Sequence, residues 1–303
     1  MTMDIFMTGA TGYIGGTIAR RLLDDGHKLR GLVRDEEKAR KLADFGVEPL
    51  IGGLDDAALL TAEARRADAV INTANSDHRG AVEAFLEGLA GSNKPFLHTS
   101  GSSIVADDAR GDVAPEKIYD EDTPLDPVPG KKARVEIDRL VRGASARGVR
   151  SVVVCPTMIY GNGLGLARDS AQIPGLAKRA RSSGVVRHVG EGLNIWSNVH
   201  VEDVADIYRL ALTRAPAGAF YFAENGEASY RDICVAIARR LKLGAPQVWP
   251  FAEAAKELGA NSAAYTFGSN SRVRGKRTRS ELGWQPRHAS ATAWIEAELP
   301  LSL

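Results

Sequence analysis

The chain has 303 residues, which is enough for one large domain or two modest ones. Its 39 Lys and Arg residues nearly balance 38 Asp and Glu residues, so nothing in the charge points to a nucleic acid or a membrane surface as a partner. The two cysteines, Cys155 and Cys234, argue against a disulfide scaffold and favour a reducing compartment. Without a membrane-length apolar run, and with a strand predicted at the very start, we expect a cytoplasmic protein.

The first predicted elements are a strand at 4–7, a glycine-rich turn at 8–16 and an amphipathic helix at 14–25. A dinucleotide pyrophosphate requires this order, because the N-terminus of the helix presents free N–H groups to the anion. Glycine permits the sharp turn off the strand and lets the backbone approach the phosphates. The cofactor contacts predicted in this segment are Gly9, Thr11, Gly12, Tyr13 and Ile14.

Short apolar runs and helical patterns then alternate along the first half of the chain. Apolar runs lie at 29–33, 47–51, 69–72, 96–98 and 151–155. Helical patterns lie at 36–45, 57–67, 80–90 and 131–146. This alternation predicts an α/β fold with a doubly wound parallel sheet, the Rossmann fold, whose ligands bind at the carboxyl ends of the strands.

The pattern changes after Tyr160, where a glycine-rich loop is followed by a helical segment at 173–181 and a short strand at 185–188. A helix at 200–213 and a strand at 220–222 are expected to return to the large sheet. We therefore predict a dinucleotide-binding domain at 1–160, with 196–223 returning to its sheet. A smaller substrate-binding lobe is predicted at 161–195 and 224–303.

The segment Thr-Gly-Ala-Thr-Gly-Tyr-Ile-Gly-Gly at 8–16 resembles the extended short-chain dehydrogenase/reductase superfamily, whose members include NAD(P)-dependent epimerases and dehydratases. Segments at 53–56, 72–75, 155–161 and 196–205 are also similar to that superfamily, so the resemblance spans nearly the whole chain. It implies that Leu54 flanks the adenine, that Ala74 lies near the ribose, and that a third segment lies beside the nicotinamide. The contacts implied in that third segment are Pro156, Thr157 and Met158.

Arg34 occupies the end of the second predicted strand, where an NAD site typically has an acidic side chain for the ribose 2′-hydroxyl. A guanidinium at this place pairs with a 2′-phosphate, and Lys38 follows one helical turn later. NADP is therefore the predicted cofactor. Asp35 keeps NAD as an alternative, and no metal ion is expected.

The reaction of the superfamily uses a Tyr-x-x-x-Lys pair, in which the tyrosine moves a proton while the lysine lowers its pKa and holds the ribose. The resemblance assigns Lys132 to the lysine position, because Glu136 matches the glutamate found four residues later. Val128 then occupies the tyrosine position, and valine cannot transfer a proton. A register based on Lys131 places Pro127 there, which is no better.

Several groups are candidates for replacing the tyrosine. Ser100 and Ser102 flank Gly101, with which the usual catalytic hydroxyl of the superfamily aligns, and His78 follows the fourth predicted strand. Tyr119, Tyr160 and a water held by Ser100 are further options. The predicted catalytic set is Lys132, Ser100, Ser102 and His78.

These features predict an NADP-dependent oxidoreductase that reduces a carbonyl or related group of a small organic substrate, as an atypical member without the usual tyrosine. Two alternatives stay open: a non-enzymatic NADP-binding redox sensor and, with less support, a nucleotide-sugar epimerase or dehydratase. The resemblance makes a homodimer an option, since family members often pair through a helix bundle that includes the 131–146 helix.

Overall fold

Seven parallel strands form the central sheet of the computed structural model, which describes residues 2–301. Their order in the sheet is β10-β6-β5-β4-β1-β2-β3. The strands are β1 (Asp4–Thr8), β2 (Lys28–Val33), β3 (Glu48–Ile51), β4 (Ala69–Asn72), β5 (Pro95–Thr99), β6 (Arg150–Pro156) and β10 (Ala219–Ala223). The central strands β4 and β5 are buried from end to end, since helices cover both faces of the sheet. The predicted doubly wound Rossmann fold is confirmed.

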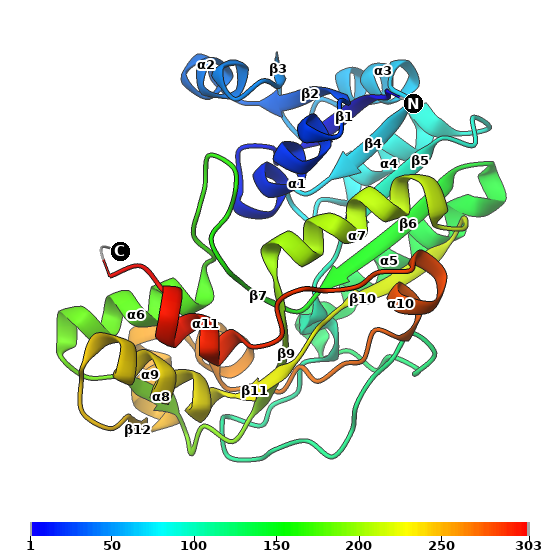
Figure 1. Ribbon diagram of the computed structural model, residues 1–303. Coiled ribbons are helices and arrows are strands. Elements are labelled where there is room, and N and C mark those ends of the chain that lie inside the picture. The colour runs from blue at the N-terminus through cyan, green and yellow to red at the C-terminus, as the bar shows by residue number, and fades with distance from the viewer. Residues whose placement is uncertain (1, 302–303) are drawn as a thin grey trace.

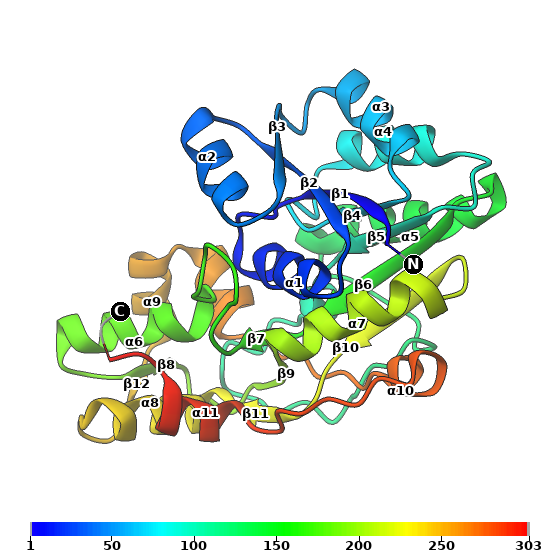
Figure 2. The same cartoon turned by 45° about the horizontal axis from the view of Figure 1, so that its top comes forward.

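Three helices cover each face. The first face carries α1 (Tyr13–Asp24), α2 (Glu36–Asp44) and α7 (Val201–Arg214). The second face carries α3 (Ala57–Arg66), α4 (Arg79–Leu89) and α5 (Lys132–Gly143). Figures 1 and 2 show α1 and α7 side by side, although almost 180 residues separate them in the chain, and their apolar sides join one core.

The strand order reverses at β1, which lies between β2 and β4. The chain proceeds from β1 outward to β3, and then returns to β4 and continues outward through β5, β6 and β10. The loops that follow β1 and β4 therefore diverge and leave a crevice outside the carboxyl ends of the strands. The glycine-rich turn follows β1 at this point.

A smaller lobe with its own core lies below the sheet in Figure 1. Its strands form two small sheets, of order β11-β9-β7 and β12-β8. They are β7 (Met158–Tyr160), β8 (Arg187–Val189), β9 (Ile195–His200), β11 (Glu227–Ser229) and β12 (Gln247–Trp249). Its helices are α6 (Gln172–Ser183), α8 (Tyr230–Leu241), α9 (Phe251–Leu258), a π-helical turn (Ser262–Phe267) and α11 (Ala291–Glu298). The helix α10 (Lys276–Leu282) packs instead against β10 and α7.

The segment 196–223, which was expected to return to the large sheet, divides between the two parts of the fold. Its last strand, β10, pairs with β6 at the edge of the seven-stranded sheet. Its helix, α7, packs on α1, whereas β9 pairs with β7 and β11. The proposed domain boundaries themselves stay a prediction.

Two prolines determine where α5 begins. Pro127 and Pro129 lack a backbone N–H and restrict the residue before them, so a regular helix cannot run through this stretch. A short 3-10 turn (Pro129–Lys131) leads into α5, which starts at Lys132. Other 3-10 turns are Ser102–Val105 and Ala144–Arg147. Within residues 2–301, no helix has the length and apolar character needed to cross a bilayer.

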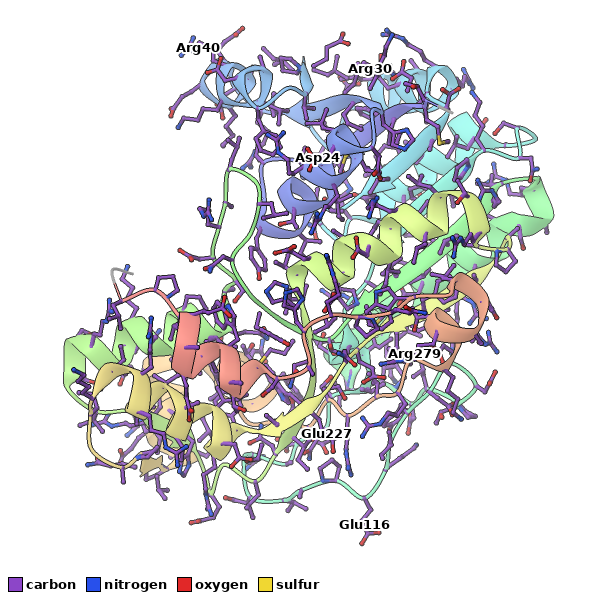
Figure 3. The ribbon with its side chains drawn as sticks, in the orientation of Figure 1. Asp24, Arg30, Arg40, Glu116, Glu227 and Arg279 are labelled. Carbon is purple, nitrogen blue, oxygen red and sulfur yellow. The ribbon has the colours of Figure 1, made fainter. Side chains whose placement is uncertain are left out.

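Two groups of ion pairs fix the outer parts of the fold, and Figure 3 shows where they lie. Near the top of the sheet, Arg30 is buried and pairs with Asp4 at 2.5 Å and with Glu63 at 2.8 Å. Where the small lobe meets the large domain, Glu227 binds Arg272 and Arg274, each at 2.8 Å. The two arginines hold the pKa of Glu227 at about 2, so this pair stays charged at neutral pH.

Candidate active site

The glycine-rich turn leaves room for phosphate only because its glycines have no side chains. Gly9 has a φ of +76°, and a Cβ there would lie 2.7 Å from the Thr73 backbone. A Cβ on Gly15 would lie 2.2 Å from the Gly9 carbonyl oxygen. The first helix turn of α1 follows directly, and its N-cap, Gly12, makes no side-chain capping bond. The exposed N–H groups and the close backbone packing fit a bound pyrophosphate.

A cavity of about 290 Å³, here called the Arg34 cavity, lies on one side of this turn. Six of the predicted cofactor contacts line it: Gly9, Thr11, Arg34, Lys38, Leu54 and Ala74. Asp35 caps α2 by accepting from the Lys38 N–H at 2.8 Å, and its carboxylate also pairs with the Lys38 ammonium at 3.1 Å. The one acid next to Arg34 is thus engaged with its own helix.

A second cavity of about 460 Å³, the Tyr13 cavity, lies on the other side of the turn. Further predicted residues line it: Gly12, Tyr13, Ile14, Ser100, Pro156 and Thr157. The loop after β7 covers this cavity, because the Tyr13 hydroxyl donates to the Gly161 carbonyl at 2.8 Å. The Leu164 N–H donates to the Thr17 hydroxyl at 3.1 Å and holds the same loop against α1.

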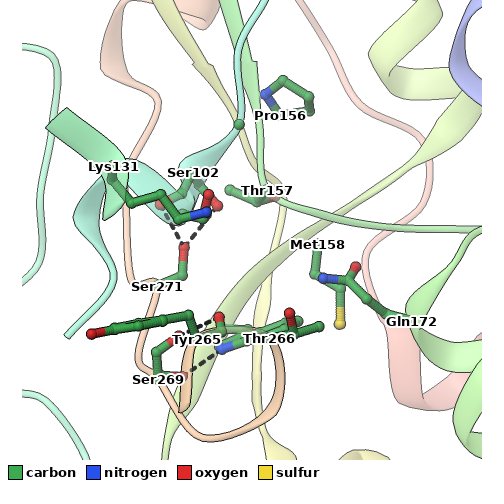
Figure 4. Close-up of a pocket in the computed structure, with 13 residues that line it drawn as sticks. Ser102, Lys131, Pro156, Thr157, Met158, Gln172, Tyr265, Thr266, Ser269 and Ser271 are labelled. Atoms are coloured by element: carbon green, nitrogen blue, oxygen red, sulfur yellow. Dashed lines mark hydrogen bonds between the residues drawn. The ribbon is translucent and has the colours of Figure 1, made fainter. Parts of the chain in front are cut away.

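A third cavity of about 220 Å³, the Ser102 cavity, lies between the sheet and the small lobe (Figure 4). It adjoins the Tyr13 cavity, because Gly101, Pro156, Thr157 and Gln172 line both. The large domain contributes Ser102 and Lys131, and β7 of the small lobe contributes the predicted Met158. The small lobe contributes residues that the sequence did not single out for the site: Trp196, Tyr265, Thr266, Ser269 and Ser271.

The structure brings Lys131 into this cavity, one residue before the predicted Lys132. Lys131 is half-buried, and Figure 4 shows its side chain directed toward Ser102 and Ser271, whereas Lys132 is exposed on the first turn of α5. Burial lowers the pKa of Lys131, and the nearby Arg134 acts in the same direction. The 3-10 turn before α5 is the reason that Lys131, and not Lys132, lines the cavity. With Lys131 in the lysine position, Pro127 occupies the tyrosine position four residues earlier.

The two predicted serines have different partners. Ser271 donates to the Ser102 carbonyl at 3.0 Å, so its only hydroxyl proton is used. In the 2.7 Å contact between the two hydroxyls, Ser102 is therefore the donor. Ser100 instead donates at 2.7 Å to Asp138, a buried carboxyl on α5. Burial raises the pKa of Asp138 to about 7, against the opposing effect of that hydrogen bond.

His78 and the two tyrosines have structural contacts in this fold. His78 caps α4, with Nδ1 accepting from the Ala81 N–H at 3.1 Å and Nε2 at 3.0 Å from Asp55. The buried Tyr160 donates to the carbonyl of His288 at 3.1 Å. Tyr119 pairs through its backbone with the 272–274 segment. None of these three residues lines one of the three cavities. Their assignment as proton donors stays a prediction.

Two characterised proteins are similar to this chain in sequence. The chain is 32% identical to "Oxidase ucsJ" of Acremonium sp over 94% of its length and 93% of that protein. It is 31% identical to the 4-hydroxy-2-methyl-3-oxo-4-farnesyl-3,4-dihydroquinoline-1-oxide ketoreductase of Stigmatella aurantiaca, over 74% of this chain and 69% of that one.

Among solved structures, dTDP-glucose 4,6-dehydratase from Bacillus anthracis in complex with NAD has a TM-score of 0.77. The match covers 97% of this chain and 95% of that one at 17% identity, so it speaks for the fold alone. Residues 5–221 match the profile of the NAD dependent epimerase/dehydratase family. The chain therefore belongs to the NAD dependent epimerase/dehydratase family, and membership implies that it binds NAD(P).

Proposed function

We propose that this protein is an NADP(H)-dependent reductase of a carbonyl or related group on a small organic molecule. The arrangement of the cavities carries this proposal. The Arg34 and Tyr13 cavities flank the glycine-rich turn, as the two halves of a dinucleotide would, and the Tyr13 cavity adjoins the Ser102 cavity. A substrate in the Ser102 cavity would lie next to the nicotinamide end of the cofactor.

The preference for NADP over NAD rests on the charges of the Arg34 cavity. Arg34 and Lys38 line it, and a guanidinium can pair with a 2′-phosphate through two hydrogen bonds. Asp35, the acid that would favour an NAD ribose, is already used as the cap of α2. A 2′-phosphate would therefore meet the Arg34 guanidinium, which lines the cavity and makes no ion pair within 4.0 Å among residues 2–301.

The Ser102 cavity supplies groups suited to a carbonyl substrate. NADPH, when bound, supplies a hydride. The Lys131 ammonium would stabilise negative charge that develops on the substrate oxygen, and it does so strongly because the site is half-buried. The side chains of Trp196, Tyr265 and Met158 would bind the organic part and exclude water. The similarity to the Stigmatella aurantiaca ketoreductase supports the same class of reaction.

NADPH oxidation by the purified protein against a panel of aldehydes, ketones and quinones, with NADH in parallel, tests this proposal. We expect turnover with at least one compound and a higher rate with NADPH than with NADH. Binding of NADPH without reduction of any panel compound would favour a redox sensor, the alternative that the missing tyrosine supports. Purified protein carrying tightly bound NAD would favour an epimerase or dehydratase.

A further inference from the structure

Asp138 is a buried carboxyl whose two oxygens have different surroundings. Its side chain is on the inner side of α5, and the residue is only 3% exposed. Oδ2 accepts from the Ser100 hydroxyl at 2.7 Å, while Oδ1 is buried and has no hydrogen-bond partner within residues 2–301. An unpaired buried acceptor costs about 1–3 kcal/mol of stability. An apolar residue would avoid that cost at a position on the buried side of α5, so the carboxyl has no evident structural advantage there.

The carboxyl also lines a cavity of its own. This Asp138 cavity, of about 240 Å³, lies between α5, β10 and the 120–125 segment. Val135, Phe220 and Phe222 form an apolar wall beside Asp138. The cavity reaches solvent, since Asp122, another lining residue, has a side chain that is 69% exposed.

Asp138 and Ser100 therefore connect two separate cavities through the protein interior. The Asp138 cavity lies on one side, and Ser100 lines the Tyr13 cavity, where the reacting end of the cofactor is expected, on the other. One hydrogen bond joins the two residues. This is the arrangement that a proton path requires, because each transfer along it needs neighbouring groups within hydrogen-bond distance.

We propose that Asp138 and Ser100 deliver a proton from the Asp138 cavity to the oxygen of the reduced substrate, in place of the tyrosine that this chain lacks. The proposal rests on the reductase function proposed above. When Asp138 is protonated on Oδ2, the 2.7 Å hydrogen bond runs from the carboxyl O–H to the Ser100 oxygen, which frees the Ser100 hydroxyl proton for the substrate. The carbonyl carbon gains a hydride from the reduced nicotinamide dinucleotide, and its oxygen takes the Ser100 hydroxyl proton. Ser100 takes the proton of the Asp138 carboxyl through the same hydrogen bond. The resulting carboxylate regains a proton from water in the Asp138 cavity, so each turnover consumes one hydride and one solvent proton.

The surroundings of Asp138 hold the carboxyl in its proton-donating form near neutral pH. Burial is the largest effect and raises its pKa to about 7, whereas Ser100, Arg134 and Arg142 act in the opposite direction and Asp77 adds to burial. The titratable or charged groups that line the Asp138 cavity or act on the carboxyl are Asp77, Asp120, Glu121, Asp122, Arg134, Arg139, Arg142 and Cys155. Glu121 also has a raised pKa through burial, so the entrance holds a second proton-accepting group.

The test compares Asp138→Asn with Glu136→Gln, an exposed carboxyl on the same helix. Asparagine keeps the shape and the acceptor for Ser100 but cannot pass on a proton. With NADPH and the panel compound that the wild-type protein reduces fastest, we expect kcat to fall about tenfold to hundredfold in Asp138→Asn. The wild-type kcat should also decline as the pH rises through about 7, and this decline should vanish in Asp138→Asn while NADPH affinity is unchanged.

Chemical rescue by a small acid is a second measurement, and it would give no effect if Asp138 had a purely structural role. Asp138→Ala leaves space next to a cavity of about 240 Å³, which admits a small carboxylic acid such as formate. We expect formate to restore part of kcat in Asp138→Ala and to leave Glu136→Gln and the wild-type protein unaffected.

The outcomes separate the two proposals. Wild-type turnover with an unchanged rate and pH profile in Asp138→Asn would overturn the proton path and leave the reductase function standing. Loss of turnover in Asp138→Asn with its pH profile retained, and no rescue of Asp138→Ala by formate, would overturn the path as well. Absence of wild-type turnover against the whole panel would instead overturn the reductase function, and the path with it.

Discussion

The hydroxyls of Ser102 and Ser271 lie 2.7 Å apart, although 169 positions separate them in the chain. Ser102 begins the 3-10 turn that follows β5 in the large domain, and Ser271 belongs to the small lobe. Both are almost fully buried, and each is the hydrogen-bond partner of the other. The candidate active site therefore forms only when the two parts of the fold are packed together.

Removal of the Ser271 hydroxyl should affect the site through Ser102. Ser271→Ala leaves the Ser102 hydroxyl without its acceptor, and an unpaired buried donor costs about 1–3 kcal/mol. We expect kcat/KM for the reduced substrate to fall about tenfold, with NADPH binding little changed. Ser280→Ala, on the exposed side of α10, is the control and should behave as wild type. Equal kcat/KM values for the two variants would contradict a role of Ser102 in the active site.

Substitutions of the adjacent Lys131 and Lys132 test which of the two lysines acts in the active site. Lys131 lines the Ser102 cavity and Lys132 is exposed. Lys131→Met should lower kcat/KM with NADPH about tenfold to a thousandfold, because a buried positive charge near the reacting oxygen is lost. Lys132→Met should change it less than about twofold, as is usual for exposed positions. A large loss of kcat/KM in Lys132→Met and a small one in Lys131→Met would show that Lys132 is the lysine of the active site.

Cofactor preference should depend on Arg34. Arg34→Ala removes the guanidinium expected to bind the 2′-phosphate, at a cost of about 1.5–3 kcal/mol for a charge-assisted hydrogen bond. We expect Kd for NADPH, measured by fluorescence titration, to rise at least about tenfold while Kd for NADH stays the same. Arg40→Ala on the outer side of α2 (Figure 3) is the control. A similar rise in Kd for NADPH and NADH would mean that Arg34 does not bind the 2′-phosphate.

The glycine-rich turn should not tolerate a side chain at Gly15. A Cβ there would lie 2.2 Å from the Gly9 carbonyl oxygen and 2.4 Å from the Thr73 hydroxyl. Gly15→Ala should therefore abolish NADPH binding and destabilise the fold by about 2–4 kcal/mol. Gly143→Ala, where a Cβ meets nothing within 4 Å, should be neutral or stabilising by up to about 1 kcal/mol. Thermal unfolding of both variants checks this, and a Gly15→Ala protein with wild-type Tm would contradict the packing.

Asp138 should make stability depend on pH. Burial raises its pKa in the folded protein to about 7 from the ordinary value of 3.8, so between these values the folded state holds a proton that the unfolded state has lost. The free energy of unfolding contributed by this group therefore falls as the pH rises from about 4 to about 7, by at most about 4 kcal/mol.

Asp138→Asn removes that dependence. The Tm of Asp138→Asn relative to wild type should accordingly rise between about pH 4 and about pH 7. The Glu136→Gln variant should follow the wild-type curve over the same range. Parallel curves for Asp138→Asn and wild type would show that the carboxyl does not titrate in this range.

The sequence by itself determined the fold class and the cofactor crevice, because both depend on local patterns. Apolar strands that alternate with amphipathic helices can bury their faces only in a layered parallel sheet. The spacing of the glycines at 9–15 reflects backbone contacts within the turn, because a Cβ on Gly12 or Gly15 would crowd the Gly9 carbonyl oxygen. The predicted cofactor contacts at Arg34, Leu54 and Thr157 likewise follow strand ends, which the parallel sheet brings to one edge.

Only the tertiary structure decided which groups share the catalytic end of the crevice. The choice between Lys131 and Lys132 depends on how a proline-induced 3-10 turn enters α5, and a one-residue difference rotates a side chain by about 100° around a helix. Ser271 and Tyr265 come from the other lobe, and no local pattern encodes a contact across such a distance. Asp138 reads in the sequence as an ordinary polar helix residue, and only the packing of α5 on the sheet buries its carboxyl beside Ser100.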